Sequence, residues 1–255
     1  MKPLGTVAQC WRYPVKSMQG QPRSELSITA AGVNGDRAWA LIDIAANRIL
    51  SAKRSGDLLG ARAGDDAIEL PDGFTIALKD PDASSALSRW LARDVRLARP
   101  RAGEQLAYQM TFDPPNDDAE YFDIPTPEGS FVDLAPLHLV TTATLVGCVN
   151  ARPDLDWDVR RFRPNLVISL DDEAFCEDGW SGQAVQVGSQ VVLDVLQPTV
   201  RCAMPLRAQP GLQRQPRLFS ALNELNAAFP NHLGVYAGIR TPGPIRVGDP
   251  VTLLS

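Results

Sequence analysis

One cysteine of this chain stands in a setting that suits chemistry. Cys202 directly follows Arg201 in the stretch PTVRCAMP, which begins and ends with Pro198 and Pro205. The positive charge of an adjacent arginine favours the thiolate, and a thiolate is both a nucleophile and a ligand for soft metals. A free cysteine is also a small hydrophobe that often packs inertly in a core. The stretch therefore offers two alternatives, a reactive or metal-binding sulfur and a buried structural residue.

Basic residues concentrate in a few turn-flanked stretches, although the whole chain has a net charge of −5. They lack the acidic partners at i,i+4 spacing that accompany charges on a solvated helix face. The run Arg-Phe-Arg-Pro-Asn offers forked donors and an amide on a stiff chain, which suits a multi-oxygen anion such as phosphate. Surface charge paired with nearby aspartates is the alternative. The stretches are YPVKSM with Lys16 and Ser17, GDRAWA with Arg37, SAKR with Lys53 and Arg54, VRRFRPN with Arg160, Arg161, Arg163 and Asn165, and PTVRCAMP with Thr199 and Arg201.

Several common kinds of site are excluded by the residues present. Only two histidines occur, His138 and His232, so a histidine-rich metal site cannot form. The four cysteines are far apart and form no CxxC, which argues against zinc, iron–sulfur and disulfide frameworks. Neither GxGxxG nor the P-loop pattern is present. The cysteines are Cys10, Cys148, Cys176 and Cys202. We expect Cys10 and Cys148 to be core residues and Cys176 to be partly exposed.

Charge and hydropathy limit the partners and the compartment. A net charge of −5 argues against nonspecific nucleic-acid binding, which needs a basic face. No apolar run approaches the roughly 18 residues that span a bilayer, and the first residues lack a secretory signal. We therefore expect a cytoplasmic protein that binds neither nucleic acid nor membrane.

The elements that must position these residues are mostly short strands. The chain contains 19 glycines and 21 prolines, and strand-like runs alternate with turn signals throughout. Asn34-Gly35, between two such runs, predicts a hairpin, and a second hairpin is predicted around Gly188-Ser189. Apolar spacing predicts helices over 82–94 and 218–229, and a third helix, capped by a threonine near 141, that ends about residue 149. The pattern predicts a mainly β fold with a few helices (α+β) and a barrel-like architecture.

The stretches that carry the chemistry coincide with those of a known family. The whole chain resembles proteins with an N-terminal MOSC β-barrel domain followed by a MOSC domain, and the matching motifs follow the family's order. The resemblance implies a β-rich N-terminal domain over 1–117 and a barrel-like MOSC domain over 118–255, joined near the Pro- and Asp-rich run FDPPNDDAEYFDIPTPEG. The motifs are YPVKSM, GVNGDRAWALID, SAKR, FVDLAPLHLVTTATL, RFRPNLVI, RCAMP and GPIRVGDPVTLL.

The resemblance also implies a cofactor and a reaction. The chain is similar to amidoxime-reducing molybdenum enzymes, which reduce N-hydroxylated compounds, and Cys202 occupies the place of their molybdenum ligand. Asp133 lies where relatives carry an acid near the metal and is a catalytic candidate. A small-molecule substrate and a separate electron-donor protein, ferredoxin-like or a b-type cytochrome, are implied because the chain lacks the cysteines of a ferredoxin domain. The implied molybdopterin-binding residues are Lys16, Ser17, Arg37, Arg163, Asn165 and Thr199, with Arg160, Arg161 and Arg201 less directly matched.

One departure from the family keeps an alternative open. In the reductases the run after the cysteine resembles C-x-x-T-T-x-D, whereas here it is CAMPLRAQPG. The missing acid favours a carrier or transferase, in which Cys202 bears a persulfide or the cleft holds molybdopterin for delivery without redox turnover. A cofactor-free scaffold that binds another anion is a third alternative.

Overall fold

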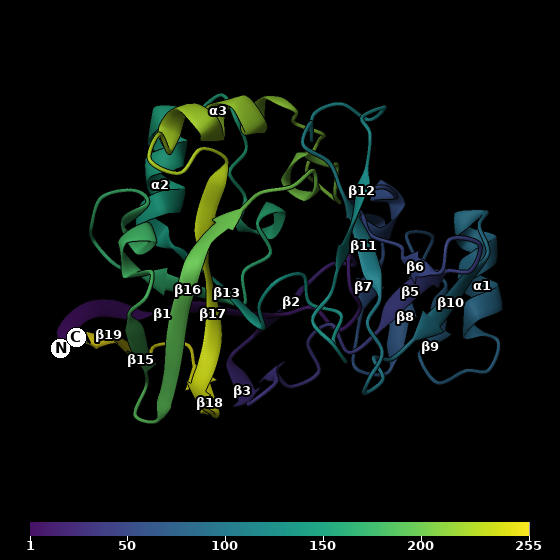
Figure 1. The fold of residues 1–255 in the computed structure, drawn as a ribbon, viewed down its shortest axis with the longest axis horizontal. Coiled ribbons are helices and arrows are strands. Elements are labelled where there is room, and N and C mark those ends of the chain that lie inside the picture. The colour runs from purple at the N-terminus through teal and green to yellow at the C-terminus, as the bar shows by residue number, and fades with distance from the viewer. Residues whose placement is uncertain (255) are drawn as a thin grey trace.

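A closed barrel dominates one side of the molecule (Figure 1). The computed structural model describes residues 1–254, and within them seven strands close the barrel because β14 pairs with β1. Among the barrel strands in the described part of the chain, only β13 and β14 pair in parallel. The helix α2 (Thr142–Ala151) supplies the crossover that a parallel pair requires. In spatial order the strands are β14 (Leu166–Ser169), β13 (Leu137–Thr141), β17 (His232–Thr241), β16 (Val191–Val200), β15 (Ala184–Val187), β19 (Pro250–Leu254) and β1 (Lys2–Arg12).

Alternating side chains build the core of this barrel. Val185, Val187, Val191 and Leu193 on the β15–β16 hairpin are fully buried, while the residues between them are more exposed. This period of two is the pattern of a strand with one face toward a core. Outside the barrel lie α3 (Arg217–Leu225) and the short 3₁₀ helices η2 (Val159–Arg161), η3 (Cys176–Trp180) and η4 (Met204–Leu206).

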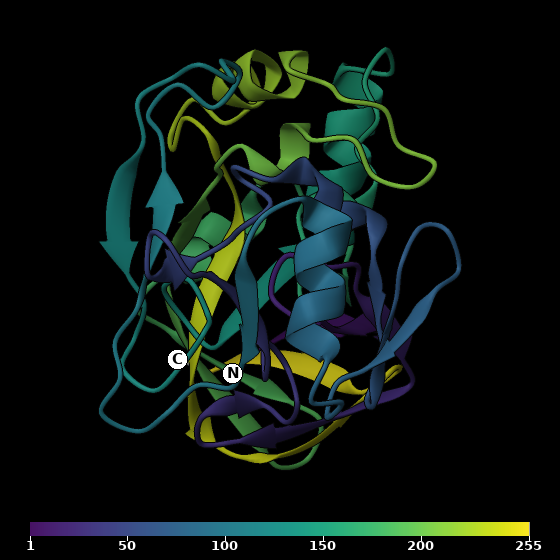
Figure 2. The same ribbon diagram turned by 90° about the vertical axis from the view of Figure 1, so that its right-hand side faces the viewer.

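The smaller half of the molecule has its own apolar cluster, which includes the fully buried Leu58, Leu59, Ile68 and Leu87. The view turned by 90° shows α1 in front of its small sheets (Figure 2), and in Figure 1 the β11–β12 hairpin runs between the two halves. The elements of the smaller half are β5 (Ala40–Asp43), β6 (Arg48–Ile49), η1 (Gly56–Gly60), β7 (Arg62–Ala63), β8 (Ala67–Glu69), β9 (Thr75–Ala77), α1 (Ala83–Leu91), β10 (Val95–Ala98), β11 (Ala107–Met110) and β12 (Phe122–Pro125). The remaining strands are β2 (Gln21–Arg23), β3 (Glu25–Thr29), β4 (Gly32–Val33) and β18 (Gly243–Arg246).

The mainly β prediction with few helices is confirmed. Thr141 caps α2 as expected, since its hydroxyl accepts from the backbone N–H of Thr144 at 3.1 Å. The helix predicted over 218–229 is α3, which ends at Leu225, short of the predicted Phe229. The first strand of the chain belongs to the barrel, and β11 and β12 pair across residues 117 and 118. The domain boundary placed there from the sequence stays a prediction.

The hairpin predicted at Asn34-Gly35 is wrong. β4 pairs with β3, whereas β5 pairs with β6 and β10. The turn is held elsewhere, because the Tyr13 N–H donates to Asp36 Oδ1 at 2.7 Å and the Arg37 N–H donates to the Tyr13 carbonyl oxygen at 2.7 Å. These two bonds direct the chain away from β4 and toward the junction of the two halves. Among the described residues, no helix is long and apolar enough to cross a membrane.

Gly234 offers a test of how closely β17 packs on β13. Its φ is +76°, and a Cβ there would lie 2.4 Å from the Leu139 carbonyl oxygen and 2.5 Å from His138 Nε2. We expect Gly234→Ala to lower the free energy of unfolding by about 3 kcal/mol, from backbone strain plus overlap. Gly211→Ala, with a φ of +78° and nothing within 4 Å, should lose only about 1 kcal/mol. Equal losses in urea unfolding would contradict the close packing.

Candidate functional site

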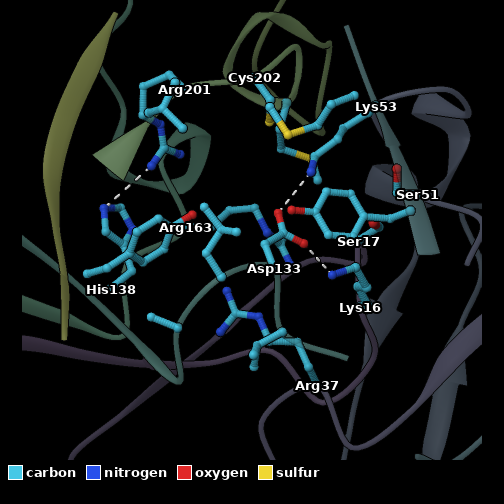
Figure 3. Close-up of a pocket in the computed structure, with 18 of the residues that line it drawn as sticks. Lys16, Ser17, Arg37, Ser51, Lys53, Asp133, His138, Arg163, Arg201 and Cys202 are labelled. Carbon is cyan, nitrogen blue, oxygen red and sulfur yellow. Dashed lines mark hydrogen bonds and ion pairs between the residues drawn. The ribbon is translucent and has the colours of Figure 1, made fainter. Parts of the chain in front are cut away.

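One cavity at the junction of the two halves collects most of the predicted site residues. The barrel half and the smaller half both supply its wall. Figure 3 shows Asp133 near its centre, with Lys53 and Lys16 reaching it from two sides and Cys202 above. The predicted residues in the wall are Lys16, Ser17, Arg37, Asp133, Arg163, Asn165, Arg201 and Cys202.

Asp133 links two buried lysines. Its carboxylate forms an ion pair with Lys16 and a second with Lys53, whose Nζ lies 2.9 Å from Oδ2. Lys16 also donates to the Phe131 carbonyl oxygen at 2.6 Å. Burial opposes ionisation of Asp133, but the two lysine charges outweigh it and hold the pKa of this carboxyl well below its usual range. Burial is the largest influence on Lys16 and lowers the pKa of its ammonium to about 8.

Tyr13 organises two of the arginines. The guanidinium of Arg163 lies 4.2 Å from the centre of the Tyr13 ring and that of Arg37 lies 4.7 Å from it, both within cation–π range. The Tyr13 hydroxyl donates to the Pro164 carbonyl oxygen at 3.0 Å, and Arg163 donates to that of Met18 at 2.6 Å. These contacts fix both guanidinium groups. Burial lowers the pKa of Arg163 to about 10.

Arg201 is held from several sides. Its Nη2 donates to the Phe162 carbonyl oxygen at 2.8 Å, and its Nη1 lies 3.4 Å from His138 Nε2. The Arg201 backbone carbonyl accepts from the Asn231 side chain at 2.6 Å. Burial first, and then the charge of Arg201, hold the pKa of His138 well below its ordinary value. The imidazole is therefore neutral, and its Nε2 also lies 3.3 Å from the Leu233 carbonyl oxygen.

Three residues of the wall have left-handed backbone conformations that side chains other than glycine rarely adopt. The φ angles are 71° at Ser17, 45° at Arg37 and 55° at Arg163. Each costs roughly 1–2 kcal/mol relative to an ordinary conformation. Strain of this kind gathers at functional sites, where the surrounding structure holds it in place. All three strained residues belong to the basic motifs singled out in the sequence.

Cys202 differs from the other three cysteines in its surroundings. Its side chain is half-buried and lines the cavity, in company with Arg201 and Met204. Cys10 and Cys148 are buried in apolar clusters, and Cys176 is half-buried, as predicted. The described cysteines form no disulfide.

Three of the implied cofactor-binding residues lie away from the cavity wall. Thr199 is buried on β16 but is not part of the wall. Arg160 pairs with Asp158, and Arg161 is fully buried and donates to the Pro205 and Gln213 carbonyl oxygens. Arg161 therefore braces the segment that follows Cys202.

The cavity also contains residues that sequence reasoning did not assign to it. Lys53 was visible as a cation in SAKR, but its bond to Asp133 joins residues 80 positions apart. Ser51 belongs to the same SAKR stretch but was not assigned to the site. Tyr108 and Tyr236 carry no sequence signal of a site, because a lone hydroxyl in a strand-like run is common. Their role becomes visible only when the halves meet.

Several buried polar atoms of the wall have no hydrogen-bond partner within the described chain. These are Ser17 Oγ, Ser51 Oγ, the Tyr108 hydroxyl and Arg201 Nε. Buried polar groups are normally paired, and an unpaired one costs about 1–3 kcal/mol. The same wall contains five cationic side chains. Only two carboxylates accompany these charges, Asp133 in the wall and Asp36, which pairs with Arg37. The arrangement suits an anionic ligand rich in oxygen.

Comparisons with known proteins identify the family of the chain. Family models match the chain over residues 4–99 (MOSC N-terminal beta barrel domain) and 127–252 (MOSC domain). The mitochondrial amidoxime-reducing component 1 of Homo sapiens is 26% identical over 291 residues, covering 100% of this chain and 84% of that protein. Component 2 of the same species is also 26% identical, covering 98% and 84%. The crystal structure of the YUAD protein from Bacillus subtilis matches with a TM-score of 0.52 and 11% identity, over 99% of this chain and 97% of that one, which shows the fold alone.

The lowered pKa of Lys16 predicts a pH effect on stability. Between pH 8 and 10.5 the unfolded chain binds more protons at this residue than the folded chain. The free energy of unfolding therefore increases as the pH rises through this range. Relative to Lys16→Met, the wild type should gain about 1–2 kcal/mol between pH 7.5 and 9.5. Urea unfolding of both proteins measures this difference, and taking the difference removes the other titrating groups. A difference that stays constant would mean that Lys16 keeps its proton throughout.

Proposed function

Because the chain belongs to the MOSC family, we propose that its cavity binds a molybdenum cofactor and that the protein reduces N-hydroxylated compounds. One observation carries the proposal. A sulfur atom, that of Cys202, lies in the same cavity as five cationic side chains and several unpaired hydroxyls. The names of the relatives, amidoxime-reducing components, support the class of substrate.

The residues present fit molybdopterin. Its phosphate needs buried cations and polar donors, and Arg37, Arg163 and Lys16 supply the charge. Ser17 Oγ is buried without a partner and is a free donor on the same wall. Lys16, Ser17, Arg37, Arg163, Asn165 and Arg201 would hold the pterin and its phosphate, and Cys202 would be the protein's ligand to the metal.

When bound, the cofactor supplies a two-electron change at its metal. The overall reaction then converts an N–OH group, two electrons and two protons to N–H and water. The electrons would come from a separate donor protein, ferredoxin-like or a b-type cytochrome. The substrate is a small molecule that enters the cavity.

The chain's own residues have distinct parts in this proposal. Asp133 remains ionised because Lys16 and Lys53 both bind it. It is therefore better suited to positioning the two ammonium groups than to donating a proton. Neutral His138, whose Nε2 lies 3.4 Å from Arg201 Nη1, would help to orient that guanidinium group. The catalytic role assigned to Asp133 from the sequence stays a prediction.

A carrier of the cofactor, or a sulfur transferase with a persulfide on Cys202, is the second candidate function. The segment after the cysteine favours it, because Ala203, Met204 and Pro205 are buried and offer the cavity no acid. Reduction of an N-hydroxylated amidine to the amidine by cofactor-loaded protein with an artificial reductant separates the two. We expect amidine to form, whereas a carrier would contain cofactor and form none.

Metal content tests the role of Cys202. We produce Cys202→Ser in a host replete with molybdenum. Because this variant loses the thiolate ligand, we expect its metal content to be about one tenth of the wild-type content or lower. Cys176→Ser is the matched control and should keep the wild-type content, because its sulfur lies outside the cavity wall. Molybdenum and pterin are both measured per chain. Equal metal in Cys202→Ser and wild type would reject Cys202 as the ligand.

A further inference from the structure

The hydroxyl of Tyr108 is an unused donor in the cavity. Tyr108 lies on β11, opposite Ile124 of β12, and its ring is fully buried in an apolar cluster. Its hydroxyl, in the wall of the cavity, has no hydrogen-bond partner within residues 1–254. The other fully buried tyrosine near the cavity, Tyr13, does have one, since it donates to a backbone carbonyl at 3.0 Å. An unpaired buried phenol in a cavity indicates that a ligand completes its hydrogen bonding.

Two ammonium groups lie near the ring of Tyr108. Lys53 Nζ is 3.9 Å from the ring centroid and Lys16 Nζ is 5.0 Å from it, and both lysines are held there by Asp133. Cations at these distances are attracted to the face of the ring. The same contacts fix the ring, so the hydroxyl is pre-positioned.

The phenol keeps its proton. Burial first, and then the negative charge of Asp133, raise the pKa of Tyr108 above its ordinary value. Tyr108 and Cys202 both line the cavity. Tyr108 is therefore a donor, whereas the lysines beside it are already occupied by a carboxylate.

We propose that the hydroxyl of Tyr108 donates a hydrogen bond to the oxygen of the substrate's N–O group, which makes Tyr108 a catalytic residue. The inference rests on the proposed function. Negative charge grows on that oxygen as the N–O bond breaks, so a fixed donor stabilises the transition state more than the ground state. The two protons of the overall reaction come from solvent, and Tyr108 loses none.

Tyr108→Phe tests this, because it keeps the ring and its cation contacts and removes only the hydroxyl. Binding of an N-hydroxylated amidine to oxidised, cofactor-loaded protein, measured by calorimetry without reductant, should weaken about tenfold. Binding of the corresponding amidine, which lacks the oxygen, should stay unchanged. The reduction rate at saturating substrate should fall about tenfold to a hundredfold, with wild-type cofactor content.

Tyr121→Phe is the matched control. Tyr121 precedes β12, and its hydroxyl donates to the Lys53 backbone carbonyl at 3.1 Å outside the cavity wall. It should bind both compounds as the wild type does. Wild-type binding and reduction by Tyr108→Phe would overturn the inference, as would loss of cofactor from it, which would place Tyr108 in the cofactor site. If wild-type protein itself reduces no N-hydroxylated compound, the proposed function fails instead.

Discussion

Four cations are buried in the wall of one cavity and a fifth, Arg37, is partly buried there, and this is the constraint on which the rest of the structure depends. Taking a charge out of water is costly unless an opposite charge accompanies it. Asp133 serves two lysines and Asp36 one arginine, which leaves Arg163 and Arg201 with backbone carbonyls and ring faces as partners. The lowered pKa values of Lys16 and Arg163 reflect the same cost of removing charge from water. A bound anion would offset it.

The fold meets this constraint by closing one half of the chain on the other. The first strand completes the barrel, and the chain then leaves it through Tyr13 and Lys16 to build the smaller half. The left-handed turns at Ser17 and Arg37 lie on that exit, and the one at Arg163 faces them from the barrel half. The cavity is thus assembled where the backbone is least relaxed, as is typical of sites held by their surroundings.

The motifs of the site could be predicted from the sequence, whereas the contacts between these motifs could not. Basic residues without helical partners and a cysteine beside an arginine could be identified because their types and spacing are unusual. The hairpin predicted at Asn34-Gly35 does not form because Tyr13 sets the geometry of this turn, and this tertiary contact overrides the local hairpin preference. Arg161 shared a basic motif with Arg163 but is buried within the barrel half. Tyr108 could not be found, since its importance comes from neighbours distant in the chain.

The response of the cofactor-free protein to inorganic phosphate tests the central claim most directly. Phosphate stands in for the cofactor's phosphate, and a ligand that binds only the folded state raises the thermal midpoint. At constant ionic strength we predict that phosphate raises the midpoint of the wild type well above its value in chloride, and that Arg163→Met loses most of the increase. Equal midpoints in phosphate and chloride, or an undiminished increase in Arg163→Met, would show that the buried cations do not form an anion site.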